Sequence, residues 1–211
     1  MRFPLSKSIT LIELLIATAL VSVIVLGLSS IDIFSRHHVL TSERRIKLQN
    51  EVSYIIDHMT KNLSQAFGNT VIDPVNDPST DDVVDVLLCD GNPPNVGVAV
   101  YVEDIDGNGR PQGSVDRRIA YIFRPSDNML KFFNNYEGGC TPDLAGEILS
   151  NQIVSFIPGF APGASGNYSN YIDLQITACW DPDGSPNPCG TPDNPNVNMR
   201  AHIMLPSVST N

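Results

Sequence analysis

The sequence contains none of the local motifs that most often mark an active site. No G-x-S-x-G nucleophile elbow, phosphate-binding glycine loop or H-E-x-x-H helix occurs in its 211 residues. Surface or packing roles explain each of the four histidines, His37, His38, His58 and His202. We therefore expect a protein without catalytic activity.

Basic side chains are scarce in the C-terminal two thirds of the chain. Residues 69–211 hold six Lys and Arg against eighteen Asp and Glu, a formal balance of −12, whereas residues 1–68 hold seven against five. Because no basic stripe is present to contact phosphates, we expect no nucleic-acid binding. An acidic surface favours cations or basic partner surfaces, although a solvated surface without a partner explains it equally simply.

Charge is also missing from a long N-terminal run. Residues 14–31 carry no charged side chain, and as a helix they would cover ~27 Å of the ~30 Å hydrocarbon layer of a membrane. Arg2 and Lys7 precede the run and Asp32 follows it, so the positive-inside rule places the N-terminus in the cytoplasm and the remaining chain outside. The alternative is a cleaved secretory signal with a cut site at residues 27–29, but the run exceeds the usual length for one.

A single carboxylate, that of Glu13, stands at the front of this run. Thr10 and Glu13 fit the capping box S/T-x-x-E, which explains a helix start. A carboxylate inside the apolar boundary is costly, at ~2.5–3.5 kcal/mol in the centre of a membrane and less near the interface. Such a group is usually functional and needs a positive partner, which a newly made N-terminal amine would supply.

The segment K-S-I-T-L-I-E-L-L-I-A at residues 7–17 resembles the class III signal of type IV prepilins and type II secretion pseudopilins. In that family a membrane peptidase cuts four residues before the glutamate and methylates the new amine. The resemblance implies a leader of residues 1–8, cleavage between Ser8 and Ile9, and pairing of Glu13 with the Ile9 amine of a neighbouring subunit. The family usually has glycine and phenylalanine where this chain has Ser8 and Ile9.

The apolar pattern continues beyond the span and predicts one helix from Ile9 to Phe67. Its first half, residues 9–34, would serve the membrane and assembly, and its second half, residues 35–68, is amphipathic. Apolar residues recur there at spacings of three and four, namely Val52, Ile55, Ile56, Met59, Leu63 and Phe67. Residues 68–69, Gly-Asn, would end the helix. A coiled coil is the alternative, but the spacing lasts under three heptads.

The composition changes after this helix, and residues 69–211 predict an extracytoplasmic β-rich domain. Short runs of β-favouring residues alternate with turn residues. Hairpin-like turns such as residues 126–128 favour an antiparallel sheet. The expected strands are 83–88, 96–102, 118–124, 129–133, 153–157, 171–178 and 198–205. The predicted fold class is therefore α+β, pilin-like, with the amphipathic half of the helix packed on the sheet.

The four cysteines, Cys89, Cys140, Cys179 and Cys189, all lie in the β-rich domain. An even count in an exported domain predicts two disulfides, for which three pairings are possible. We favour Cys179–Cys189, which closes a short proline-rich loop, and this leaves Cys89–Cys140. Zinc is disfavoured because no C-x-x-C motif or nearby histidine is present.

The best candidate for a small-ligand site is the segment E-D-I-D-G-N-G at residues 103–109. Asp104, Asp106 and Asn108 alternate as in calcium loops. The twelfth position, where calcium loops carry a glutamate, is Val115, but the adjacent Asp116 could close a nonstandard site. A glycine-rich turn that needs no metal is the alternative. Calcium is thus the one cofactor that the sequence suggests.

The layout of the β domain, with the segments 118–123 and 147–156, is most similar to PilW-like or J-type minor subunits. We therefore expect a minor pilin or pseudopilin of the bacterial inner membrane that joins a periplasmic or extracellular filament. Its partners would be other subunits, prepilin peptidase and the inner-membrane assembly platform. The alternative is a signal-anchored extracytoplasmic binding or adhesion module that does not polymerise.

Overall fold

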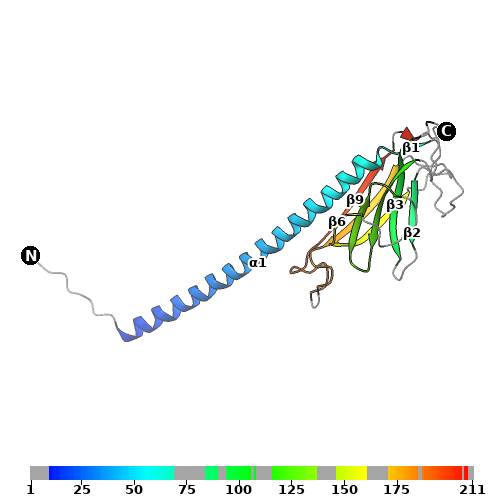
Figure 1. Ribbon diagram of the computed structural model, residues 1–211. Helices are drawn as coiled ribbons and strands as arrows, with labels where there is room; N and C mark the ends of the chain where they lie inside the picture. Colours follow the sequence, from blue (N-terminus) through cyan, green and yellow to red (C-terminus); the bar gives the residue numbers. More distant parts are fainter. Residues whose placement is uncertain are drawn as a thin grey trace, which may run out of the picture. The chain divides into compact units, whose positions relative to one another are not determined.

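The computed structural model describes residues 10–68, 84–89, 94–105, 107, 116–136, 146–160, 171–184, 187–205 and 207–208. Its longest element is helix α1, Leu11–Leu63 (Figure 1). The chain divides into two compact units, Met1–Glu43 and Arg44–Asn211, and α1 contributes to both of them. The long N-terminal helix expected from the sequence is therefore confirmed.

The strands of the second unit form two antiparallel sheets and a short parallel pair. The five-stranded sheet has the order β2-β3-β4-β5-β6, with bounds Val84–Cys89, Asn95–Glu103, Arg117–Arg124, Met129–Phe133 and Glu147–Ser150. The three-stranded sheet has the order β7-β8-β9, with bounds Ile153–Phe160, Tyr171–Cys179 and Asn196–Met204. The parallel pair joins β1, Phe67–Gly68, to β10, Ser207–Val208.

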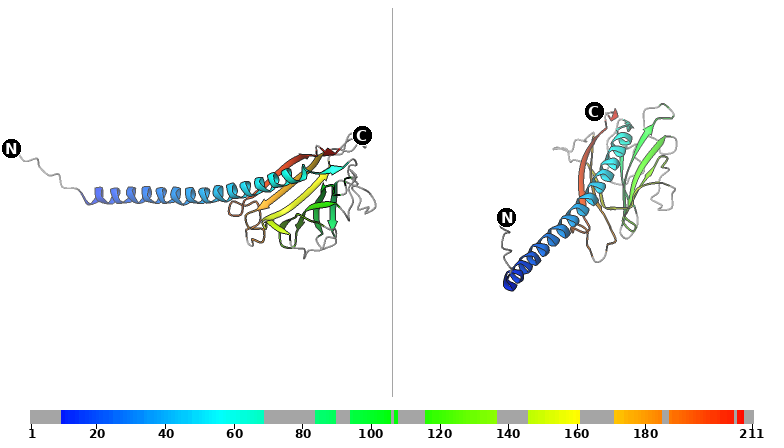
Figure 2. Two further views of the ribbon diagram at one scale, coloured as in Figure 1. Left: turned by 45° about the horizontal axis from the view of Figure 1, so that its top comes forward. Right: turned by 90° about the vertical axis from the view of Figure 1, so that its left-hand side faces the viewer.

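The amphipathic half of α1 supplies one wall of the main core. Its buried stripe packs against inward side chains from both sheets, including Val98, Tyr121, Leu174 and Ile203. Figure 2 shows this half of the helix, in cyan, lying against the strands of both sheets. The stripe consists of Leu48, Val52, Ile55, Met59 and Leu63. Four of these five residues were expected in the stripe from the helical spacing, which confirms the predicted packing of this half.

The structure differs from the sequence-based expectation at the end of the helix. The helix ends at Leu63, four residues before the expected Phe67. Gln65 N–H and Ala66 N–H donate to the carbonyls of Asn62 and Leu63, which tightens the chain into a turn with three-residue spacing. Phe67 thereby becomes the first residue of β1, and its apolar side chain is explained by the strand and not by the helical stripe.

The expected single sheet is also divided. β6 was not among the expected strands, and only residues 151–152 separate it from β7, which belongs to the other sheet. Asn151 is exposed and Gln152 N–H donates to Ser150 Oγ at 3.0 Å. The chain thus changes sheets in a two-residue connection that a hydroxyl side chain stabilises, without the proline or glycine that usually reveals a break.

Candidate functional site

The front of α1 forms the expected capping box. The Oε2 atom of Glu13 accepts from both the backbone N–H and the Oγ1 hydroxyl of Thr10, each at 3.2 Å. In return, Glu13 N–H donates to Thr10 Oγ1 at 3.4 Å. These bonds satisfy backbone donors at the helix start, and they place a carboxylate next to the positive end of the helix dipole. Ser8 and Ile9, the expected processing residues, lie outside the described residues.

The helix that follows exposes apolar side chains all round. It contains an eighteen-residue window that is apolar enough to cross a membrane, and none of that window is buried in the structure. The serine hydroxyls of this part of the helix form their hydrogen bonds inside the helix, because Ser22, Ser29 and Ser30 each donate to a carbonyl one turn back. The surface of this segment is therefore suited to lipid or to the apolar helices of other chains.

The first charges after the window lie on the helix surface. Arg36 Nε is 3.0 Å from Asp32 Oδ2, which is a one-turn pair on exposed side chains. The His38 ring packs edge-on against Phe34 with 4.2 Å between the ring centroids. The contact with Phe34 agrees with the packing role expected for His38.

The C-terminal half of α1 carries a polar contact with the sheet that sequence reasoning missed. The hydroxyl of Tyr121 on β4 is within hydrogen-bond distance of His58 Nδ1, at 3.0 Å, and of Asn62 Nδ2, at 3.1 Å. Tyr121 is fully buried, and burial raises the pKa of its phenol well above the usual value. In the sequence, the only sign of this contact is that His58 and Asn62 lie four residues apart beside the apolar stripe. That spacing does not reveal which strand lies opposite them.

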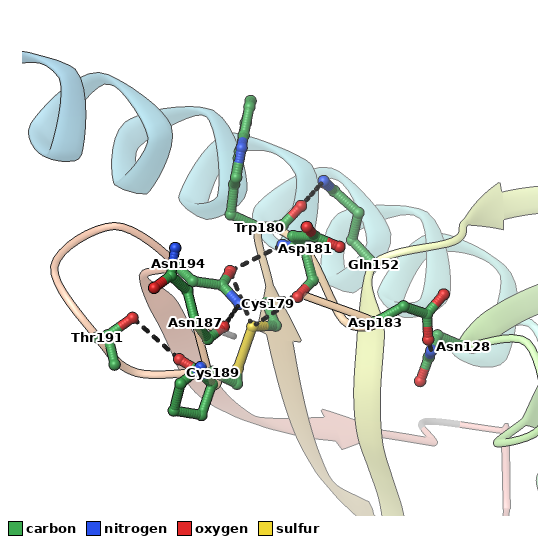
Figure 3. The surroundings of a disulfide bond; sticks show 11 residues. Asn128, Gln152, Cys179, Trp180, Asp181, Asp183, Asn187, Cys189, Thr191 and Asn194 are labelled. Atoms are coloured by element: carbon green, nitrogen blue, oxygen red, sulfur yellow. Dashed lines mark hydrogen bonds between the residues drawn. A yellow bond between two sulfur atoms is a disulfide. The ribbon is translucent and has the colours of Figure 1, made fainter. Parts of the chain in front are cut away.

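The structure contains the favoured disulfide, Cys179–Cys189 (Figure 3). Cys179 ends β8 in the core, whereas Cys189 lies in an exposed part of the loop. Cys140 lies outside the described residues, so the pair Cys89–Cys140 remains a prediction.

Asn194 is the centre of this disulfide loop and was not anticipated. Its side chain is 2% exposed. Its Oδ1 accepts from Asp181 N–H at 2.8 Å, and its Nδ2 donates to the carbonyls of Asp181 and Asn187, also at 2.8 Å (Figure 3). Gln152 Nε2 donates to the Trp180 carbonyl at 2.7 Å and ties the start of the loop to the connection between β6 and β7. The loop is therefore held in one conformation by side chains as well as by the disulfide.

A pocket of about 310 Å³ lies between the disulfide loop and α1. Arg44 donates from Nη1 to the Asp193 carbonyl, and the indole of Trp180 has Arg44 Cζ and Lys47 Nζ at 5.8 and 6.0 Å from its ring centroid. The wall of the pocket is made by Arg44, Trp180, Asp181, Gly184, Asn187, Asp193 and Asn194. The mixed charges and amide groups make this a polar pocket.

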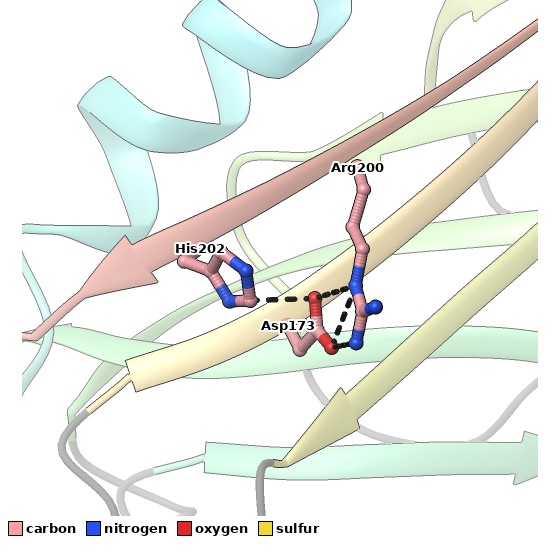
Figure 4. A network of polar contacts seen from close by, with 3 residues as sticks. All are labelled: Asp173, Arg200 and His202. Atoms are coloured by element: carbon pink, nitrogen blue, oxygen red, sulfur yellow. Dashed lines mark hydrogen bonds and ion pairs between the residues drawn. The ribbon is translucent and has the colours of Figure 1, made fainter.

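A charged group lies on the outward face of the three-stranded sheet (Figure 4). Arg200 on β9 binds both carboxylate oxygens of Asp173 on β8, and His202 Nδ1 is 3.5 Å from Asp173 Oδ1. The hydrogen bond from Arg200 holds the pKa of the Asp173 carboxyl below its usual value, and the same contact raises the pKa of Arg200. The pairing of Asp173 with His202 across the two strands places these groups together.

The expected calcium residues are only partly within the described chain. Asp106 and Asn108 lie outside it. Asp104 Oδ1 accepts from Gly107 N–H at 2.7 Å, and Asp116 Oδ1 accepts from Ile105 N–H at 2.9 Å, so both carboxylates hold the backbone of the hairpin loop. Among the described residues no group of three or more His, Cys, Asp or Glu side chains could hold a metal ion. Calcium at this loop stays a prediction.

Comparisons with known proteins do not assign the chain to a family. No protein-family model, no curated protein and no solved structure matches it.

Proposed function

We propose that this protein is a minor pilin or pseudopilin, a structural subunit of a type IV pilus or a type II secretion pseudopilus. The observation that carries the proposal is the position of Glu13, a carboxylate at the front of an apolar helix whose surface is exposed on every side. Subunits of this kind are anchored in the inner membrane by the helix before assembly. They then leave the lipid by burying the same helix among those of their neighbours.

The geometry at Glu13 is compatible with an intermolecular role. One oxygen, Oε2, accepts the capping bonds from Thr10, and within the described chain no hydrogen bond reaches the other oxygen, Oε1. A carboxylate oxygen can therefore accept the amine of a processed neighbour while the helix cap stays in place. In an apolar surrounding, an unpaired carboxylate is costly, so pairing would favour one register between adjacent helices.

The arrangement of the second unit supports the same proposal. The second unit has its own core of buried side chains from α1 and both sheets. In this proposal the second unit supplies the outer surface of the filament, and the exposed apolar side chains between Leu11 and Ile31 supply the contacts between helices.

The test compares Glu13→Gln with Glu43→Gln in cells that contain the matching prepilin peptidase and assembly system. Gln can still fill the third position of a capping box, so Glu13→Gln removes the charge and retains the helix start. Glu43 is an exposed glutamate of the same helix, beyond the apolar window. We expect Glu13→Gln to reach the membrane normally and to enter filaments roughly tenfold less, which corresponds to about 1.4 kcal/mol. The control should assemble normally.

Immunoblots of membrane and sheared-filament fractions measure incorporation, and the intact mass gives the N-terminus. A chain that begins at methylated Ile9 supports the proposed function as a filament subunit. A chain that retains Met1 would support the non-polymerising anchor instead, and equal incorporation of Glu13→Gln would remove the pairing role.

A further inference from the structure

Strand β9 is an open edge of the three-stranded sheet. It pairs with β8 along its whole length, from Met204 opposite Tyr171 to Asn196 opposite Cys179. Within the described part of the chain, no strand pairs with its other side, and Figure 2 shows β9 as the outermost strand of this sheet. The backbone N–H and C=O groups along such an edge form a template on which a further strand can pair.

Proline, glycine and bulges, which interrupt strand pairing at an edge, are absent from β9. Its nine residues include no proline or glycine, and its register with β8 has no bulge. The opposite edge, β7, contains Pro158 and has a register shift near Ile153. In the larger sheet, β6 has four residues and pairs irregularly with β5, and β2 has six residues. β9 is therefore the longest regular edge that the described residues offer.

The inward side of β9 is incompletely covered. Val197 and Ile203 are buried near the two ends of the strand, but Met199 and Ala201 between them are only half-buried. Met199 packs against the edge of the core, and Ser53 Oγ of α1 lies 3.9 Å from its Sδ. Apolar side chains on an added strand would complete the burial of these two residues.

The outward side of β9 favours acidic side chains on that strand. Arg200 and His202 are both about 60% exposed, at 63% and 60%. Arg200 uses Nε and Nη2 on Asp173, so its Nη1 points to no partner within the described chain and can bind a further carboxylate. A second copy of β9 in antiparallel pairing centred on Arg200 would set the two Arg200 side chains opposite each other, which disfavours self-pairing in that register.

We propose that β9 binds an extended segment of another protein as a fourth strand of this sheet. Acidic side chains of the segment lie beside Arg200 and His202, and alternate apolar side chains cover Met199 and Ala201. This surface lies in the second unit, and the inference does not depend on the proposed filament function.

The probe is a fluorescent nine-residue peptide of alternating Glu and Val, titrated against the full chain in detergent by fluorescence anisotropy. The matched peptide carries Lys in place of every Glu. Two further peptides carry methyl groups on the backbone nitrogens, either of all Glu residues or of all Val residues. Because the N–H groups of alternate residues point to the same edge of a strand, each set removes the hydrogen-bond donors of one edge. We expect saturable binding of the Glu peptide, at least tenfold weaker binding of the Lys peptide, and at least a tenfold loss for one of the two methylated peptides.

The variant Arg200→Glu should reverse the preference between the Glu and Lys peptides, and the fluorescence of Trp180 verifies that it is folded. Glu13→Gln should bind the Glu peptide normally, so a failure of the filament proposal leaves this result intact. Absence of saturable binding up to about 1 mM, equal binding of the Lys peptide, or undiminished binding of both methylated peptides would each overturn the proposal.

Discussion

At the scale of single residues, the organisation of the disulfide loop depends on Asn194. Its amide forms hydrogen bonds with one backbone N–H and two carbonyls of the loop. In Asn194→Ala these groups lose their partner, and a buried group without one typically costs about 1–3 kcal/mol. Since water can reach parts of this loop, we expect the free energy of unfolding to fall by about 2–3 kcal/mol in total. Urea unfolding of the full chain in detergent, followed through the single tryptophan Trp180, measures the change.

Asn187→Ala is the matched control for this prediction. Asn187 belongs to the same loop and is exposed, and the structure uses its backbone carbonyl, not its side chain, as the acceptor for Asn194. Its replacement should change the unfolding free energy by less than about 0.5 kcal/mol. Equal losses in the two variants would show that Asn194 has no special role.

The disulfide of this loop could be predicted from the sequence, whereas the different roles of these two asparagines could not. The closure of Cys179 with Cys189 follows from an even cysteine count and a short proline-rich loop, and the structure contains it. Asn187 and Asn194 both precede a proline, so both read as ordinary turn residues. Which of them points inward depends on the path of the whole loop, and no local pattern encodes that path.

At the scale of elements, the contact between α1 and β4 combines apolar packing with the polar contacts of the Tyr121 hydroxyl to His58 and Asn62. Tyr121→Phe removes the hydroxyl that receives a hydrogen bond from Asn62 and lies within hydrogen-bond distance of His58, and it leaves the ring in the core. The expected loss is about 1 kcal/mol of unfolding free energy, since the lost bond is partly offset by water reaching Asn62 at the edge of the core. Tyr54→Phe removes the same hydroxyl from an exposed tyrosine of α1 and should have little effect. Urea unfolding with both variants in parallel makes the comparison, and a smaller loss in Tyr121→Phe than in Tyr54→Phe would contradict the assignment.

The helix was the most predictable element and the sheet arrangement the least. A spacing of three and four gives the inward face of α1 directly, because that face is continuous along one element. Alternation along a strand gives only the two faces of that strand and does not identify its neighbours. The separation of β6 from β7 therefore could not be read from residues 147–160, since it depends on long-range pairing of β6 with β5 and of β7 with β8.

At the scale of the whole molecule, the sequence separates an uncharged apolar segment from an acidic β-rich domain, and the structure divides the chain into two compact units. The described strands confirm the β-rich domain. A charge balance averaged over a domain neither locates a binding site nor fixes the sign of the charges around one strand, which is why the strand edge at β9 emerged only from the topology.

Alkaline pH should destabilise the second unit because it contains two tyrosines shielded from water. Burial raises the pKa of Tyr121 and of Tyr136, and for Tyr136 the nearby Arg118 partly opposes this. Above about pH 10, which is the ordinary tyrosine pKa, the unfolded chain loses these protons while the folded chain retains them. The free energy of unfolding is then lost as pH rises, by at most about 1.4 kcal/mol per pH unit for each tyrosine. Urea unfolding between pH 8 and about 11 tests this, and Tyr121→Phe should flatten the decline whereas Tyr54→Phe should not. An unchanged slope in Tyr121→Phe would mean that other groups cause the alkaline loss.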